Sequence, residues 1–314
     1  MRGQAPSTFP STARGQRGQA PSTFPSTAPS IRREERMPRW LKKRVRCGSK
    51  LRIIENALAG ERLNTVCVGA KCPNRGECFS AGTATFMILG ARCSRECVFC
   101  AVPTGKVETV DENEPRRVAR AAAQMGLKHV VVTSPARDDL SDGGAGHFAA
   151  TIAAAREEVP GAAVEVLVPD FQGRGCDIDT VIASAPDVFN HNMETVKWLY
   201  ADVRPQADYD RSLRVLARAA GAGLVTKSGF MVGLGESFED ASRLLEDLLG
   251  VGCTHVTAGQ YLQPTAGNLA VQRYWTPEEF ELLAQEARMM GFEAVACGPF
   301  VRSSYRAREM ILQK

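Results

Sequence analysis

From residue 85 onward, short and largely apolar runs alternate with longer stretches of helical composition, and this alternation limits the fold most. Short apolar runs bounded by turn residues are typical of strands buried on both faces. The predicted strands are 85–89, 129–133, 164–168, 187–191, 224–230 and 255–260, with 294–297 as a further candidate. The predicted connecting helices are 114–125, 146–158, 178–184, 209–222, 238–249 and 278–290. Strands joined through helices run parallel, and six are fewer than the eight of a closed barrel, so we expect an α/β fold, a partial (β/α)6 TIM-like barrel.

Six of the ten cysteines lie within the 34 residues from Cys67 to Cys100. They form two sets, the first triplet (Cys67, Cys72, Cys78) and the second triplet (Cys93, Cys97, Cys100). Thiolates two to five residues apart can wrap one soft-metal cluster. Each triplet lacks a fourth thiolate, and an open position is where a cluster can do chemistry. The second triplet follows the predicted strand 85–89, so it belongs at the carboxyl ends of the strands, where α/β barrels place their active sites.

Two other uses of the cysteines are weighed against clusters. A disulfide framework is expected in short secreted chains, and no charged-then-apolar signal peptide is apparent here. A zinc-stapled binding module without catalysis is the stronger rival, but zinc sites add a fourth Cys or His. The four histidines, His129, His147, His191 and His255, lie far from the triplets in sequence.

The first 36 residues differ in composition from the rest. The segment Arg2–Ala13 recurs identically as Arg17–Ala28 in a stretch rich in Pro, Ser, Thr and Gly, for which disorder is expected. We expect a cytoplasmic protein if Met37 is the start, or a mitochondrial or plastid one if residues 1–36 are a transit peptide. The formal charge is only +4 and no apolar run is long enough to span a membrane, so neither nucleic acid nor membrane is an expected partner.

Phe99 precedes the last cysteine of the second triplet, giving Cys-x3-Cys-x-aromatic-Cys. This pattern resembles the cluster motif of the radical S-adenosylmethionine (SAM) superfamily. The stretch Gly229–Glu236 resembles that superfamily's adenine-contacting motif, with Met231 in the Ile place and further matches at Gly233 and Glu236; the alternative is a tight strand-to-helix turn. The resemblance implies a partial barrel of the radical SAM type with an N-terminal cluster-binding extension, a 4Fe–4S cluster on the second triplet, and SAM as cofactor.

The first triplet, Cys-x4-Cys-x5-Cys, resembles the lipoyl synthase family. Further matching stretches across residues 37–308 are 136–140, 142–144, 169–171, 190–195, 203–205, 226–229, 260–265 and 302–305. The resemblance implies a sulfurtransferase that inserts two sulfur atoms, at C6 and C8, into a protein-bound octanoyl chain with SAM-derived radicals. It implies a second, auxiliary 4Fe–4S cluster on the first triplet that donates the sulfur, with a serine as fourth ligand. We expect Ser304 in that role, with Ser303 as the alternative. Serine is a harder and weaker iron ligand than thiolate, which suits a cluster that is dismantled.

Other cofactor contacts are open at the level of sequence. Asn192 and Glu194 could hold the ribose hydroxyls of SAM, or Asn192 could cap a helix. Lys227 and Arg302 could meet a carboxylate of SAM, or pair with Asp138 or Asp139. The remaining polar candidates are expected to be structural, with His191 a buried imidazole, Cys176, Cys253 and Cys297 core thiols, and Cys47 incidental.

The expected organisation is an extension over 1–36, the auxiliary-cluster segment over 37–84, the partial barrel over 85–300 and a tail with the serine ligand over 301–314. The resemblance implies as partners an octanoylated lipoyl carrier, either the lipoyl domain of a 2-oxoacid dehydrogenase E2 subunit or the glycine cleavage H protein. It also implies an electron donor such as ferredoxin or flavodoxin, and an iron–sulfur carrier. Other sulfur-inserting radical SAM enzymes, methylthiotransferases or biotin-synthase-like proteins, are the alternative.

Overall fold

The computed structural model describes residues 37–42, 49–80, 84–305 and 307–311. Expectations for residues 1–36 and for Cys47 lie outside these ranges. The centre of the fold is an eight-stranded sheet whose strands lie side by side in chain order, from β1 to β8. The strands are β1 (Asn64–Thr65), β2 (Thr85–Met87), β3 (His129–Thr133), β4 (Ala163–Leu167), β5 (Val188–Asn190), β6 (Thr226–Val232), β7 (His255–Gln260) and β8 (Ala294–Gly298).

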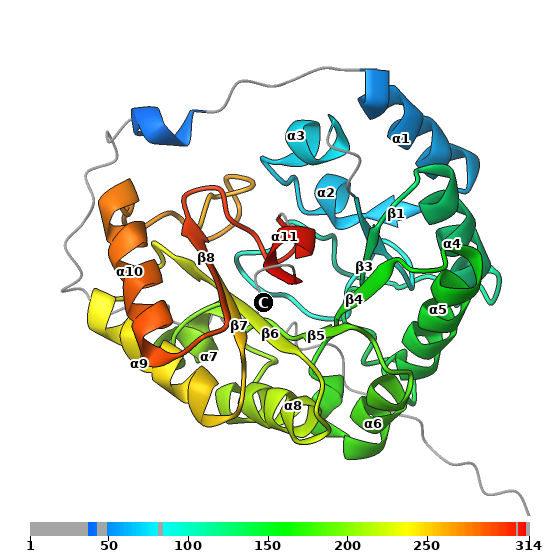
Figure 1. Ribbon diagram of the computed structural model, residues 1–314. Coiled ribbons are helices and arrows are strands. Elements are labelled where there is room, and N and C mark those ends of the chain that lie inside the picture. The colour runs from blue at the N-terminus through cyan, green and yellow to red at the C-terminus, as the bar shows by residue number, and fades with distance from the viewer. Residues whose placement is uncertain (1–36, 43–48, 81–83, 306, 312–314) are drawn as a thin grey trace, which may run out of the picture.

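The sheet curves into a partial barrel in which β1 and β8 are the two edges (Figure 1). Strands β2 to β8 pair in parallel, as the alternation of strands and helices predicts. The candidate strand 294–297 is confirmed as β8, so seven parallel strands are present rather than six. The antiparallel strand β1 was not predicted, because two residues carry no alternation signal.

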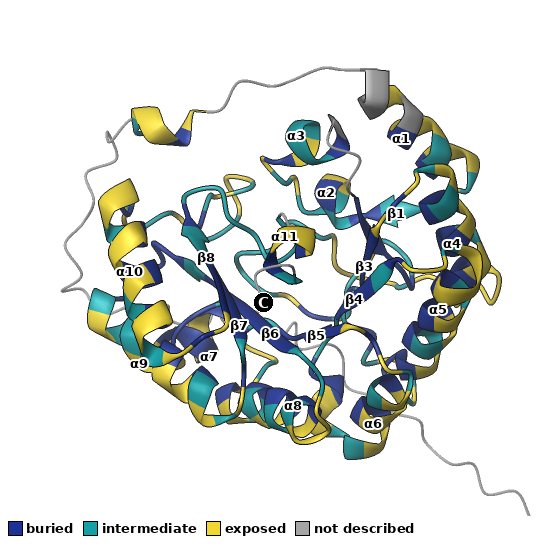
Figure 2. Cartoon of the chain, viewed as in Figure 1, coloured by how far each residue is buried: buried dark blue, intermediate teal, exposed yellow. Residues whose placement is uncertain are grey.

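Helices cover the outer face of the barrel, and the strands, which are largely buried, form its wall (Figure 2). The covering helices are α4 (Glu114–Gln124), α5 (Ala145–Glu158), α6 (Gly175–Ala183), α8 (Tyr209–Gly221), α9 (Phe238–Gly250) and α10 (Pro277–Met290). The helices α9 and α10 begin with capping boxes at Ser237 and Thr276. In each box the N-cap side chain accepts a hydrogen bond from a first-turn amide, and an acidic side chain of that turn accepts one from the N-cap amide. None of the described helices is long and apolar enough to cross a membrane.

The shorter elements are η1 (Arg39–Leu41), α1 (Ser49–Gly60), α2 (Val66–Gly69), α3 (Arg75–Ser80), η2 (Phe171–Gly173), η3 (Lys197–Leu199), α7 (Tyr200–Val203) and α11 (Ala307–Ile311). The helices α2 and α3 carry two cysteines of the first triplet, Cys67 and Cys78. The residue before α3 and α3 itself contact the C-terminal segment. Asn74 Nδ2 donates to the carbonyl of Phe300 at 2.6 Å, and the Tyr305 hydroxyl donates to Glu77 at 2.7 Å. The segment that carries the first triplet therefore contacts the C-terminal segment.

Candidate active site

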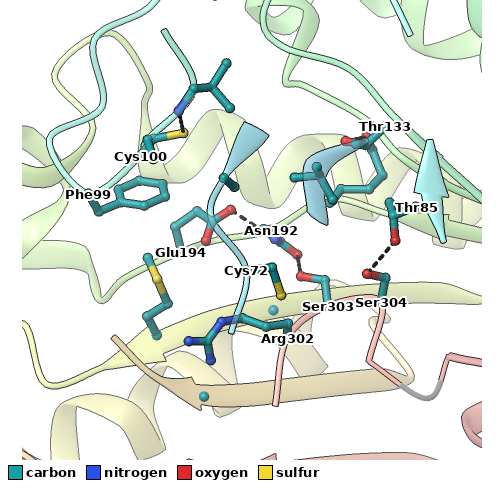
Figure 3. A pocket seen from close by; sticks show the side chains of 18 of the residues that line it. Cys72, Thr85, Phe99, Cys100, Thr133, Asn192, Glu194, Arg302, Ser303 and Ser304 are labelled. Carbon is teal, nitrogen blue, oxygen red and sulfur yellow. Dashed lines mark hydrogen bonds between the residues drawn. The ribbon is translucent and has the colours of Figure 1, made fainter. Parts of the chain in front are cut away.

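Both cysteine triplets line one cavity of about 520 Å³. Its wall includes the last residues of three neighbouring strands, Met87, Thr133 and Leu167, so it lies at the carboxyl ends of the strands. This is where ligands bind in α/β barrels. Figure 3 shows residues of both triplets, Cys100 and Cys72, with Asn192 and Glu194 lying between them.

The second triplet occupies the loop that follows β2, and backbone amides point at two of its sulfurs. Cys93 Sγ accepts hydrogen bonds from the backbone amides of Arg95, at 3.4 Å, and Ala136, at 3.3 Å. Cys100 Sγ accepts one from the amide of Val102 at 3.4 Å. Such bonds stabilise negative charge on sulfur, as a metal-bound thiolate requires.

Burial raises the pKa of the Cys100 thiol to about 12 and that of the Cys67 thiol, in the first triplet, to about 11. A thiol with so high a pKa stays protonated at neutral pH unless a metal displaces the proton. Among the described residues, no three His, Cys, Asp or Glu side chains are grouped to hold a single ion. A zinc ion would need that grouping, since Zn–S bonds of about 2.3 Å draw the sulfurs together. In a four-iron cluster each thiolate binds a different iron, so the sulfurs need not converge on one ion.

A buried ion network fixes the second triplet's loop to the barrel. Arg95, between Cys93 and Cys97, is 5% exposed and donates to Asp138 at 2.7 and 2.8 Å and to Asp170 at 2.6 Å. Asp170, fully buried, also accepts from Arg211 at 2.8 Å. Burial alone would raise the pKa of Asp170, but the hydrogen bonds and charge of Arg95 hold it well below its usual range. The loop is therefore held by charge-assisted bonds before any cluster binds.

The first triplet comes from α2, the turn after it, and α3. Cys67 lies in α2, whose N-cap Thr65 accepts a hydrogen bond from the Val68 amide. The Cys72 amide donates to the carbonyl of Cys67 at 3.2 Å, which closes the turn. Cys67 is buried against β2, where hydrogen bonds from Thr85 lower its thiol pKa but do not outweigh burial.

The two candidate serines face different halves of the cavity. Thr85 Oγ1 donates to Ser304 Oγ at 2.8 Å, which puts Ser304 on the same threonine that hydrogen-bonds Cys67. Ser303 Oγ instead donates to Asn192 Oδ1 at 2.7 Å (Figure 3). The geometry thus favours Ser304 over Ser303 as a neighbour of the first triplet.

Asn192 and Glu194 form a polar turn after β5. Asn192 Nδ2 donates to Glu194 Oε1 at 2.9 Å, and Glu194 adopts a left-handed backbone conformation with φ of 67°. Such a conformation costs a non-glycine residue of order 1–3 kcal/mol and is concentrated at functional sites. Burial raises the pKa of Glu194, although Arg204 opposes the shift. Asn192 caps no helix, because η3 begins after Val196, so the capping alternative is wrong.

The glycine-rich stretch after β6 splits between two roles. Gly229 and Met231 line the cavity, and a Cβ on Gly229 would lie 2.6 to 2.9 Å from Thr257, Ser303 and Asn192 oxygens. Gly233 and Glu236 are not on the cavity wall. Glu236 accepts from the amides of Gly233, at 2.5 Å, and Leu234, at 2.9 Å, and Gly233 has a φ of 99°. Gly233 and Glu236 thus form the tight strand-to-helix turn that the sequence leaves open as the alternative to an adenine-contacting motif.

The two candidate cations are placed differently. Arg302 lines the cavity, as does Phe99, and donates to the carbonyl of Val301 at 2.6 Å. Lys227 lies inside the barrel in an ion pair with Glu165 at 3.0 Å, each side chain 1% exposed, and is not part of the cavity wall. Neither pairs with Asp138 or Asp139, because those carboxylates bind Arg95 and Arg137.

Outside the triplets, the cysteines match expectation only in part. All nine cysteines of the described residues are free, so a disulfide framework among them is wrong. Cys253 is a buried core thiol as expected, but Cys297 is partly exposed and Cys176, in α6, is exposed. His191 is confirmed as a buried imidazole whose Nδ1 bonds the carbonyl of Val168 at 2.8 Å.

The cavity wall also contains polar atoms that fit a bound cofactor. His191 Nε2 and Ser134 Oγ are buried there and have no hydrogen-bond partner among the described residues. Because buried polar atoms are nearly always paired in folded proteins, these two indicate a polar ligand. Together with the thiol sets, they fit SAM and iron–sulfur clusters.

Comparison with known proteins agrees with this geometry. Residues 87–248 match the Radical SAM superfamily. The chain is 55% identical over 274 residues to a lipoyl synthase of Rubrobacter xylanophilus, covering 87% of this chain and 85% of that protein. It is 49% identical over 279 residues to a lipoyl synthase of Oleidesulfovibrio alaskensis, covering 89% and 96%.

Solved structures share the fold at low identity. The hydrogenase maturase HydG from Carboxydothermus hydrogenoformans aligns with a TM-score of 0.56 and 16% identity over 72% of this chain and 55% of that one. Streptococcus suis SuiB bound to S-adenosylmethionine aligns with a TM-score of 0.52 and 11% identity over 69% and 51%.

The barrel and the second triplet therefore define a radical SAM enzyme. Within that class, the chain belongs to the lipoyl synthase family, which inserts sulfur and uses SAM and 4Fe–4S clusters. The methylthiotransferase and biotin-synthase-like alternatives are set aside by this membership.

Proposed function

We propose that the second triplet holds the 4Fe–4S cluster that binds SAM, and that the first triplet with Ser304 holds the cluster that gives up sulfur. The substrate is an octanoyl chain on a lipoyl carrier, and the product carries sulfur at C6 and C8. When bound, SAM and its cluster supply a hydrogen-abstracting radical, and the auxiliary cluster supplies the sulfur. The protein's task is to hold these groups and the substrate around one dry cavity.

The observation that carries this proposal is the shared cavity, with Thr85 in its wall. One threonine hydrogen-bonds both Cys67 and Ser304, so a serine oxygen stands beside an incomplete thiolate set. A hydroxyl oxygen is a weak ligand for iron in a sulfur environment. A cluster closed by such a ligand can exchange it for another group. The serine in the loop of the second triplet, Ser94, instead donates to the carbonyl of Ala136 at 2.9 Å.

The polar turn after β5 supports the site for SAM. The Glu194 carboxylate and the Asn192 amide are fixed against each other and can accept from and donate to ribose hydroxyls. Arg302 can bind a carboxylate, since it lines the cavity and forms no ion pair with an Asp or Glu of the described residues. Lys227 is not used, because Glu165 already neutralises it.

Apolar side chains supply the rest of the wall. Those at the strand ends and in the loop after β7 are Met87, Leu167, Val168, Phe230 and Leu262. These side chains give the apolar eight-carbon chain an apolar surface to pack against, and they exclude water from the carbon atoms that react.

A carrier-bound substrate must enter on a flexible arm, because a folded carrier domain cannot fit a cavity of about 520 Å³. We propose the lipoyl domain of a 2-oxoacid dehydrogenase E2 subunit or the glycine cleavage H protein as carrier. Ferredoxin or flavodoxin is the proposed electron donor, and an iron–sulfur carrier restores the auxiliary cluster. The cytoplasmic location stays a prediction. Rates measured separately with the two octanoylated carriers will rank them.

The test compares the two triplets in protein reconstituted anaerobically, where roughly eight irons per chain are expected for two clusters. Cys67→Ala should still cleave SAM but form no lipoyl product, whereas Cys93→Ala should lose both activities. Full lipoyl formation by Cys67→Ala would remove the sulfur-donor role.

A matched pair separates the serines. Ser304→Ala should lose lipoyl formation and keep SAM cleavage, because Ser304 lies beside the first triplet. Ser303→Ala should instead weaken SAM binding through Asn192. The reverse pattern would assign the iron ligand to Ser303.

A further inference from the structure

Arg204 is a buried arginine for which no carboxylate partner is found. Its side chain is 8% exposed and directs one guanidinium nitrogen at the carbonyls of Asn192, at 3.0 Å, and Met193, at 3.2 Å, and at the Tyr200 hydroxyl, at 2.5 Å. Among the described residues, no Asp or Glu forms an ion pair with it, and its Nε has no hydrogen-bond partner. All three of these hydrogen-bond acceptors are neutral, and the carboxylates of Glu194 and Asp170 act on its charge only through space.

The other buried arginine of the site shows the contrast. Arg95 is bound by two carboxylates, Asp138 and Asp170, and its charge is compensated within the protein. Arg204 forms no such close ion pair, so its charge can also stabilise a negative group that a bound molecule or metal cluster brings to the cavity.

The second triplet is where that negative group would be. Arg204 and Cys97 line the same cavity, and the Val98 amide donates to the Val203 carbonyl at 3.2 Å, which holds the two segments side by side. The buried charge of Arg204 therefore lies beside the loop that carries the second triplet.

We propose that Arg204 is the counter-charge of the cluster on the second triplet, and that it makes one-electron reduction of that cluster easier. The inference rests on the proposed function, which assigns a cluster to these cysteines. One electron from a low-potential donor makes a cluster with three thiolates more negative, while the donor is oxidised by one electron. A fixed cation in a low-dielectric wall stabilises the more negative state.

The same side chain positions the cofactor turn. By binding the carbonyls of Asn192 and Met193, Arg204 helps to keep Glu194 in its left-handed conformation. Loss of Arg204 could thus slow the enzyme through geometry alone, and activity would not separate the two roles. A redox measurement does, because geometry without charge does not shift a potential in a fixed direction.

The test is a redox titration of the reconstituted enzyme, followed by electron paramagnetic resonance of the signal that responds to added SAM. At a fixed poise, Arg204→Gln should lower the ratio of reduced to oxidised cluster about tenfold, which is about 59 mV for a one-electron couple. Arg204→Lys keeps the charge, so its ratio of reduced to oxidised cluster should stay within about threefold of the wild-type ratio. That change corresponds to about half the potential shift expected for Arg204→Gln. Lys197→Gln, which removes an exposed cation from the same segment, should match wild type because water screens it.

Each outcome decides the matter. An Arg204→Gln ratio equal to wild type, with equal iron content, would overturn the inference and leave the proposed function intact. If Arg204→Gln does not assemble a cluster, Arg204→Lys decides, and a tenfold fall there would overturn it. A wild-type protein with no SAM-responsive cluster would overturn both proposals.

Discussion

Asp170 ties the second triplet's loop to the barrel, and its replacement by Asn tests that design. The carboxylate is fully buried and accepts from Arg95 at 2.6 Å and Arg211 at 2.8 Å. An amide of the same size keeps the volume but removes the charge and turns an NH2 group toward a guanidinium. Removing one partner of a buried ion pair costs about 3–5 kcal/mol, and Asp138 still neutralises part of Arg95. We therefore expect Asp170→Asn to lower the free energy of unfolding by about 3 kcal/mol.

The matched control is Asp179→Asn, which removes a carboxylate whose two oxygens both accept hydrogen bonds from Arg218. Its pair with Arg218 is about half exposed on each side, so it should contribute about 0–1 kcal/mol. Urea unfolding of the iron-free protein measures both variants. Iron content after reconstitution then reports whether the loop still holds its cluster, and we expect a deficit only for Asp170→Asn. Equal unfolding energies for the two variants, or full iron in Asp170→Asn at wild-type stability, would refute the reasoning.

Three further substitutions or conditions test other parts of the site. Gly229→Ala should weaken SAM binding measured by calorimetry, by about 1–3 kcal/mol, because its Cβ would meet three oxygens within 3 Å, whereas Gly250→Ala has open space and should not. Thr85→Val should keep SAM cleavage and reduce lipoyl formation, because Ser304 loses its donor. Burial would raise the pKa of Glu165, but Lys227 and His129 lower it to about 2. Glu165 should therefore contribute about 3 kcal/mol to the free energy of unfolding. This contribution should be full above about pH 5 and should be lost as the pH falls toward about 2. A Glu165→Gln variant that shows the same acid unfolding profile would contradict this assignment.

The fold was predictable because the signal for a parallel strand is local. Five buried residues in a row, as in His129–Thr133, exclude a one-faced strand and require helices on the outer side. The two-residue strand β1 and the four-residue helix α2 carry no such periodic signal. Their conformations depend on contacts with β2, which the sequence does not display.

The site was predictable to the extent that its residues are close in sequence. The two triplets were found by spacing alone, but the partners of Arg95 lie 43 and 75 residues away, at Asp138 and Asp170. A cation between Cys93 and Cys97 was the one available signal for this network. Lys227 shows the opposite error, since a lysine in a matching segment looks the same whether it meets a cofactor or Glu165.

The two triplets are held in place by different interactions, and this difference bears on which of the two proposed clusters can be dismantled. The second triplet sits in a loop anchored by buried arginine–carboxylate bonds, where losing one partner costs about 3–5 kcal/mol. The first triplet is brought to Ser304, 219 residues from Thr85, by short helices and the C-terminal segment. The contacts between those parts include single hydrogen bonds, such as that of Asn74 with Phe300, which contribute about 0.5–1.5 kcal/mol each. The proposal that the first triplet's cluster is dismantled predicts that this set opens at a lower free energy than the second, which hydrogen exchange of the two segments in the iron-free protein would measure.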